Sequence, residues 1–201
     1  SGSKYILRTF YLTLGDGRVY LYNDCLGYDH GVIFDPNVDD WHVHISHVSP
    51  AARARGEKEK RTYFKLSELD EYLEIFSYII WHSMKHSYIF TDIAKQSWGT
   101  TNTRTAQPLD TTRYQVWGTD YLVLDDMTSY LIEVNPYPSL NHHDHPSWSN
   151  PRPHEREFRD EGFDHDLLRI LGIDETEGSD SYLSWIDVTP LDLRSKKVPQ
   201  Y

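Results

Sequence analysis

Asp120, Glu133 and Asn135 are the residues of this chain whose types and spacing best suit chemistry. They lie in an otherwise apolar stretch, residues 114–140, that reads YQVWGTDYLVLDDMTSYLIEVNPYPSL. A strand that only packs a hydrophobic core rarely carries ionisable side chains at its inner positions. Two carboxylates and an amide oxygen suit a hard cation such as Mg²⁺. The stretch is therefore a candidate metal site, although ordinary acidic residues on an exposed hairpin would give the same pattern.

The three oxygen-bearing side chains meet only if the stretch folds as a hairpin in one particular register. A turn between residues 126 and 127 places Asp120 opposite Glu133, with their Cβ atoms about 5 Å apart. Two carboxylates at that distance repel each other unless a cation lies between them. The same turn places Gly118 opposite Asn135, which leaves room for a bulky ligand and puts the oxygen donors on one face. A shift of one residue would put the two acids on opposite faces.

The composition describes a globular, acidic chain. Of its 201 residues, 38% are hydrophobic and 14% aromatic, and the net charge is −11. That charge disfavours a general nucleic-acid binder or a binder of anionic membranes, and no apolar run reaches the roughly 18 residues of a membrane helix. The lone Cys25 excludes an internal disulfide framework and favours a reducing, cytoplasmic location. Residues 1–3 have no signal-peptide character and fit a cloning remnant.

Hairpins that alternate with helices predict an α+β fold, mainly an antiparallel sheet with hairpins packed against helices. A first hairpin is expected over residues 7–22, because its central GDGR suits a tight turn with positive φ. A further strand is expected over residues 41–49. Residues 50–61 form a basic segment that is interpreted either as a solvated loop or as a contact for an acidic partner tail.

The strongest helix pattern runs over residues 67–90, with a shorter helix expected over residues 164–173. Ser67 is expected to cap the long helix, because its hydroxyl can accept from the first-turn amides. Apolar side chains recur every three or four residues along it, and one buried stripe is expected from them. That stripe consists of Leu69, Leu73, Phe76, Ile80 and Met84.

Residues 117–140 resemble the final hairpin of tubulin–tyrosine ligase and its relatives in the ATP-grasp superfamily. The family pattern is G-x-D, a short turn, and a hydrophobic E-V-N run that ends in P-S-L, and this chain has WGTD followed by YLIEVNPYPSL. The resemblance implies a C-terminal ATP-grasp lobe with ATP and Mg²⁺ as cofactors. It also implies that Asp120, Glu133 and Asn135 are the Mg²⁺ ligands.

Other segments resemble the family in the same order. KYILRTFYLT, residues 4–13, is similar to the family strand K-x-D-hydrophobic-R, which implies that Lys4 and Arg8 face the nucleotide and its phosphates. Arg8 would then stabilise the transferred phosphoryl group. VYLYNDCLGY, residues 19–28, resembles the next family strand, and HVHISHVS, residues 42–49, resembles the H-hydrophobic-T-N segment along the nucleotide. The last match implies a nucleotide-lining role for His44, Ile45, Ser46 and His47.

The chain departs from the family pattern at three places. Ile6 stands where the family has an acid that can hold the nucleotide ribose, and His47 stands where it has Asn. The family arginine after the V-Y-x-Y strand is replaced by Tyr28 or a neighbour. Each charge-assisted hydrogen bond lost in this way is worth about 1.5–3 kcal/mol, so nucleotide binding is expected to be weakened.

Two functions are compatible with these features. The first is an ATP- and Mg²⁺-dependent ligase that joins an amino acid to a protein or peptide carboxylate through an acyl phosphate, with residues 1–201 as the C-terminal portion of the domain and the first lobe missing. Its expected partners are ATP, that lobe, and tubulin or another acidic-tailed protein, in the cytoplasm or on the cytoskeleton. The alternative is a degenerate ATP-grasp pseudoenzyme that serves as a scaffold in a larger assembly.

Overall fold

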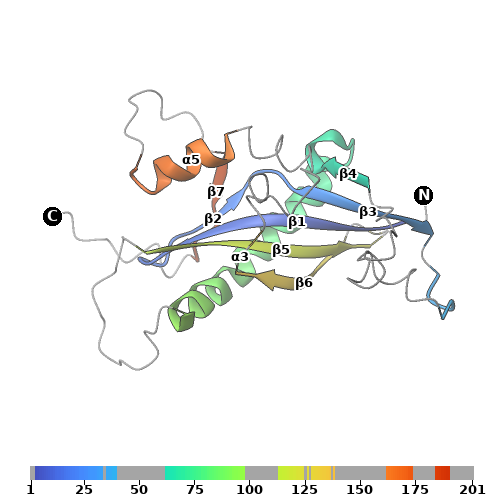
Figure 1. Cartoon of the computed structure of the whole chain (residues 1–201), viewed down its shortest axis with the longest axis horizontal. Coiled ribbons are helices and arrows are strands. Elements are labelled where there is room, and N and C mark those ends of the chain that lie inside the picture. Colours follow the sequence, from blue (N-terminus) through green and yellow to red (C-terminus); the bar gives the residue numbers. More distant parts are fainter. Residues whose placement is uncertain are drawn as a thin grey trace, which may run out of the picture.

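The computed structural model describes residues 3–33, 35–39, 62–97, 113–124, 126, 128–136, 138, 162–173 and 184–190. Antiparallel strands dominate this part of the chain, with helices packed against them (Figure 1). The predicted α+β class is therefore confirmed. The elements are β1 (Ser3–Leu14), β2 (Val19–Tyr22), β3 (Leu26–Ile33), β4 (Thr62–Lys65), the 3₁₀ helix η1 (Leu66–Glu68), α3 (Tyr72–Ser97), β5 (Tyr114–Val123), β6 (Ser129–Asn135), α5 (Phe163–Ile170) and β7 (Trp185–Asp187).

Strand β1 is the centre of the sheet. It pairs with β5 along one edge, and with β3 and then β2 along the other, all antiparallel. The sheet extends from β5 to β6, from β3 to β4 and from β2 to β7. Among the described residues it is a seven-stranded sheet in which β1 joins both sides. Because β1 pairs with β5, it fixes the position of any site on the β5–β6 hairpin.

The predicted first hairpin is confirmed as β1 and β2. Tyr11 pairs with Leu21, and Gly17 in the turn has φ of 91°. Asp16 stabilises that turn because its Oδ1 accepts a hydrogen bond from the backbone amide of Arg18 at 3.0 Å. An L-residue other than glycine would be strained at this φ, so the Asp-Gly pair explains why the chain reverses here.

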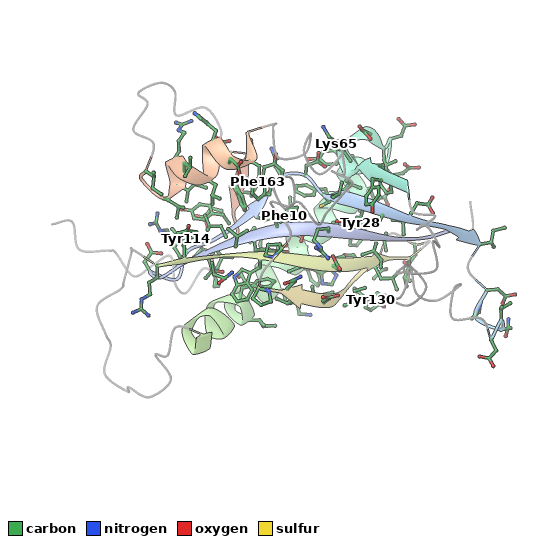
Figure 2. All side chains as sticks on the ribbon, viewed as in Figure 1. Phe10, Tyr28, Lys65, Tyr114, Tyr130 and Phe163 are labelled. Atoms are coloured by element: carbon green, nitrogen blue, oxygen red, sulfur yellow. The ribbon has the colours of Figure 1, made fainter. Side chains whose placement is uncertain are left out.

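The two faces of the sheet carry separate hydrophobic cores. On the first, here called the α3 face, Leu7, Tyr11 and Tyr121 pack with helix α3, which crosses the sheet (Figure 1). On the opposite, α5 face, Phe10 packs edge-on against Phe163 of α5, with ring centroids 5.2 Å apart (Figure 2). Because alternate residues of a strand point to opposite faces, Arg8 shares the α5 face with Phe10.

The long helix begins later than expected. Helix α3 starts at Tyr72, and Ser67 lies instead in η1. The Ser67 hydroxyl donates to Asp24 Oδ2 at 2.6 Å, and its amide donates to Asp24 Oδ1 at 3.1 Å. The predicted capping role of Ser67 is wrong because the mostly buried Asp24 carboxylate, which also accepts from the Cys25 amide, takes both of its donors.

The buried stripe of α3 is also rotated from the predicted one. Phe76 is buried and Leu69 and Ile80 pack, partly buried, against the same core as expected, but Leu73 and Met84 are 77% and 45% exposed. Among the side chains of α3 that the structure describes, the buried ones are Ile75, Phe76, Ile79, Ser83, Ser87 and Phe90. The rotation brings the Ser83 hydroxyl to the Tyr11 hydroxyl, which also bonds the Tyr121 hydroxyl at 2.9 Å. The inward side of this broadly apolar helix therefore combines apolar burial with a hydrogen bond to the sheet.

Among the remaining secondary-structure predictions, the short helix is confirmed, whereas three strands were not predicted. Helix α5 covers most of the short helix predicted over residues 164–173. Strands β3, β4 and β7 were not predicted as separate strands, and the second of them is only four residues long. The strand predicted over residues 41–49 and the basic segment 50–61 lie outside the described residues. No helix in the described part of the chain is long and apolar enough to cross a membrane.

Candidate functional site

The β5–β6 hairpin places the predicted metal ligands in the expected register. Asp120 pairs with Glu133, and Gly118 pairs with Asn135. Directly paired residues of antiparallel strands point to the same face. The two carboxylates and the amide are therefore on one face of the sheet, and it is the α5 face because Tyr121, the neighbour of Asp120, packs on the α3 face.

A β-bulge is needed to reach that register. Near the turn, Tyr121 pairs with Leu131 and Val123 pairs with Ser129, so the register shifts by one residue between Asp120 and Tyr121. A uniform register set by a turn between residues 126 and 127 is therefore wrong at the turn end. The bulge at Ile132 lets Leu131 and Val134, three residues apart, both pack against the core of the α3 face. The packing of these two residues accounts for the extra residue.

Arg8 is the cation that accompanies Asp120. It pairs with Asp120 across β1 and β5, and its Nε donates to Asp120 Oδ1 while its Nη2 donates to Oδ2 at 2.8 Å. The two side chains are only 17% and 12% exposed. A bidentate guanidinium–carboxylate pair of this kind combines fixed geometry with strong, charge-assisted hydrogen bonds. It also explains why an acid is tolerated at an inner position of β5.

The environment of Arg8 keeps its positive charge. Burial lowers the pKa of the guanidinium, but the hydrogen bonds to Asp120 and the nearby Tyr28, Asp120 and Glu133 outweigh this and raise the pKa above its ordinary value. Arg8 Cζ lies 5.9 Å from the ring centroid of Tyr28, which packs edge-on against Tyr63. Arg8 is therefore held between an acid of β5 and an aromatic pair of β3 and β4.

The space above Gly118 is filled rather than free. A Cβ atom at this position would lie 2.7 Å from Pro138 Cβ and 3.2 Å from Arg8 Cδ. The expectation that Gly118 leaves room for a bulky ligand is therefore wrong, because the chain after Asn135 folds back over it. Gln115 supports this return, since its Nε2 donates to the carbonyl oxygen of Pro136.

Comparison with known proteins places the chain in a family. The family model described as the tubulin-tyrosine ligase family matches residues 1–149. The chain belongs to this family. No curated protein matches the chain at a significant level.

The tubulin-tyrosine ligase assignment agrees with a solved structure of similar fold. The C-terminal domain of K. lactis Pby1, described as an ATP-grasp enzyme that interacts with the mRNA decapping enzyme Dcp2, is 17% identical and has a TM-score of 0.50. The match covers 94% of this chain and 48% of that one, so the chain spans about half the length of the Pby1 structure. At this identity the likeness shows the fold alone, an ATP-grasp-like α+β fold.

The donor set on the hairpin suits a hard cation such as the Mg²⁺ that ATP-grasp proteins generally use. Glu133 is exposed and Asn135 is half-buried, whereas Asp120 is buried with both oxygens bonded to Arg8. Within the described ranges, no group of three or more His, Cys, Asp and Glu side chains could hold a metal. A three-ligand site here would need the amide oxygen of Asn135 beside the two carboxylates, and a metal at Asp120 would share that carboxylate with the Arg8 guanidinium.

The other predicted site residues are placed less completely. Lys4 lies in β1, four residues before Arg8, and its side chain is not described. His44, Ile45, Ser46 and His47 lie outside the described residues, so their nucleotide-lining role stays a prediction. Sequence reasoning missed Gln115 and Pro138 as supports of the site. The proline-rich run after Asn135 was the available signal for a chain reversal there.

Proposed function

We propose that this chain is the metal- and phosphate-binding half of an ATP- and Mg²⁺-dependent ligase. The reaction is formation of an amide bond between an amino acid and a protein or peptide carboxylate through an acyl phosphate. The observation that supports it most is one row of charged residues across three neighbouring strands: Arg8 on β1, Asp120 on β5 and Glu133 on β6. Such a row offers one cationic and two anionic groups to a metal–phosphate ligand.

The polar residues of this row each have a role in the proposed reaction. Asp120, Glu133 and Asn135 would hold Mg²⁺, which when bound offsets the charge on the phosphate oxygens. Arg8 would bind the transferred phosphoryl group, since its planar guanidinium presents several donors to an anion. Family resemblance assigns nucleotide contacts to Lys4 and to the segment His44–His47. None of these residues is required to form a covalent bond with the substrate.

The proposal needs a second lobe to complete the nucleotide site. ATP-grasp enzymes enclose the nucleotide between two lobes, and this chain aligns with about half of the Pby1 structure. We therefore propose that ATP binds between this chain and a further lobe, and that catalysis requires both. An acidic-tailed protein such as tubulin is the proposed carboxylate acceptor, with a cytoplasmic or cytoskeletal location.

A direct test is to trap the acyl phosphate. The longest natural chain that carries this sequence is incubated with Mg²⁺–ATP, a Glu-rich peptide and hydroxylamine, which converts an acyl phosphate to a hydroxamate. We expect ATP-dependent hydroxamate in the wild type and none in Asp120→Asn. Glu74→Gln, an exposed acid on α3, is the matched control and is expected to behave as the wild type. Absence of hydroxamate with every carboxylate acceptor tested would count against a ligase.

The second candidate function is a scaffold that keeps the fold without catalysis. The observation that favours it is the Arg8–Asp120 ion pair, which neutralises the buried acid without a metal. An acidic residue retained on β5 is therefore not sufficient evidence of a working site. The Pby1 domain, which interacts with a decapping enzyme, is an ATP-grasp protein with a protein partner. A chain that binds no Mg²⁺–ATP but captures a protein partner would support this alternative.

A further inference from the structure

Arg8 and a metal ion would compete for the same carboxylate. Both oxygens of Asp120 accept hydrogen bonds from Arg8, one from Nε and one from Nη2. A divalent cation bound at Asp120 would stand next to a guanidinium that carries a full positive charge. Because the pair is largely buried, solvent screens that repulsion only weakly.

The surroundings of Arg8 hold it in the competing position. Its aliphatic stem passes over Gly118, where a Cβ atom would lie 3.2 Å from Arg8 Cδ and 2.7 Å from Pro138 Cβ. The ring of Tyr28 lies 5.9 Å from Arg8 Cζ. Glu133, by contrast, is exposed and open to solvent. The acid of β6 is thus accessible to a cation, whereas the acid of β5 is closed by a neighbouring side chain.

We propose that Arg8 acts as an internal cation that blocks Asp120 until an anionic ligand draws the guanidinium away. This inference rests on the proposed metal site and adds its regulation. A phosphate oxygen offers the guanidinium the same kind of acceptor as the carboxylate does. A ligand that accepts these hydrogen bonds frees Asp120 for the metal, so binding of the anion and binding of the cation favour each other, as linkage requires.

The proposal predicts that removal of the guanidinium raises the affinity for a metal alone. Mn²⁺ binding is measured by calorimetry, without nucleotide, on the wild type, Arg8→Met and Arg8→Met/Asp120→Asn. We expect Arg8→Met to bind Mn²⁺ about tenfold more tightly than the wild type or better, and the added Asp120→Asn change to abolish this gain. Arg18→Met is the matched control, because Arg18 also donates through its Nε to a carboxylate, that of Asp16, in the turn between β1 and β2.

A second measurement uses the wild-type chain and does not depend on the folding of a variant. The Nε–H group of Arg8 is followed by ¹⁵N NMR during titration with Mg²⁺ alone and with Mg²⁺–ATP, and its resonance is assigned by its absence in Arg8→Lys. We expect the resonance to shift with Mg²⁺–ATP, because the guanidinium exchanges the Asp120 carboxylate for a phosphate oxygen, and to shift less with Mg²⁺ alone at the same concentration. An unchanged resonance at Mg²⁺–ATP concentrations that calorimetry shows to saturate the site would overturn the proposal.

The outcomes separate this inference from the proposed function. Equal Mn²⁺ affinity in the wild type and Arg8→Met, with binding lost in Asp120→Asn, would refute the blocking role of Arg8 and leave the metal site intact. No Mn²⁺ binding in any variant, with or without ATP, would overturn both the blocking role and the metal site. A gain in Arg18→Met as large as that in Arg8→Met would also refute it, because the effect would then be one of overall charge.

Discussion

We expect substitution of Arg8 to reduce the stability of the folded chain, because Arg8 and Asp120 form a largely buried ion pair. Removal of one partner from a buried ion pair leaves an uncompensated charge and costs about 3–5 kcal/mol, whereas replacement of both by apolar residues is often neutral or stabilising. The two side chains are 17% and 12% exposed, so the lower end of this range applies. We expect Arg8→Met to lower the free energy of unfolding by about 3 kcal/mol.

The double-mutant cycle gives the coupling between the two residues. Arg8→Met/Asp120→Leu is expected to lie within about 1 kcal/mol of the wild type, because neither charge is left unpaired. Together with a loss of about 2–3 kcal/mol for Asp120→Leu alone, this corresponds to a coupling of at least about 4 kcal/mol, above the range usually found for contacting residues, as a buried ion pair would give.

The assay is urea unfolding followed by the fluorescence of the buried Trp117 and Trp185. Arg18→Met is the control, since the Arg18 side chain is 45% exposed and its pair with Asp16 is expected to contribute less than about 1 kcal/mol. The reasoning would be refuted if Arg8→Met cost no more than Arg18→Met. It would equally be refuted if the double variant lost as much as the two single variants together.

Three further predictions concern packing and pH. Gly118→Ala should cost about 1–3 kcal/mol of unfolding free energy in urea melts, because its Cβ would meet Pro138 at 2.7 Å; a variant as stable as the wild type would contradict this. Ile79→Ala should lower the free energy of unfolding by about 2–5 kcal/mol, because Ile79 is buried, and Leu73→Ala by less than about 0.5 kcal/mol, because Leu73 is exposed. A larger loss for Leu73→Ala than for Ile79→Ala would instead support the helix orientation predicted from the sequence. Burial raises the pKa of Tyr121 to about 12, so its contribution to stability is complete below its unfolded pKa of about 10 and is lost as the pH rises through about 12. Phenolate absorbance should show that Tyr121 ionises together with unfolding, and ionisation at about pH 10 in the folded chain would disprove the shift.

The hairpin shows what short-range pattern can and cannot predict. The pairing of Asp120 with Glu133 was predicted from a turn placed between residues 126 and 127, and it is confirmed although the register at the turn end is shifted by one residue. The bulge at Ile132 did not follow. It depends on how Leu131 and Val134 pack against helix α3, which is a contact between residues far apart in the sequence.

The orientation of helix α3 also could not be predicted from the sequence pattern alone. Its residues are apolar around most of its circumference, so several orientations satisfy a helical period, and the sequence favoured one that buries Leu73 and Met84. The structure selects the orientation in which Ser83 reaches the hydroxyl of Tyr11. Likewise, Ser67 is a suitable cap by type, but the carboxylate of Asp24, 43 residues earlier, takes its donors.

The Arg8–Asp120 pair required knowledge of strand order. Arg8 and Asp120 were each assigned a ligand-binding role from family resemblance, but their contact depends on β1 pairing with β5 across a separation of 112 residues. The pattern of residues within either strand does not predict that the two strands pair. The site could therefore be predicted as a set of residues, whereas the bond between the cation and one of the acids could not.

The central claim is that the acids of the β5–β6 hairpin hold a metal–nucleotide complex. Calorimetry of Mg²⁺–ATP binding to the longest natural chain that carries this sequence tests it most directly, with Asp120→Asn/Glu133→Gln as the variant and Glu74→Gln as the control. We predict that the wild type and the control bind and that the double variant does not. Equal binding in all three proteins, or binding in none, would contradict the claim.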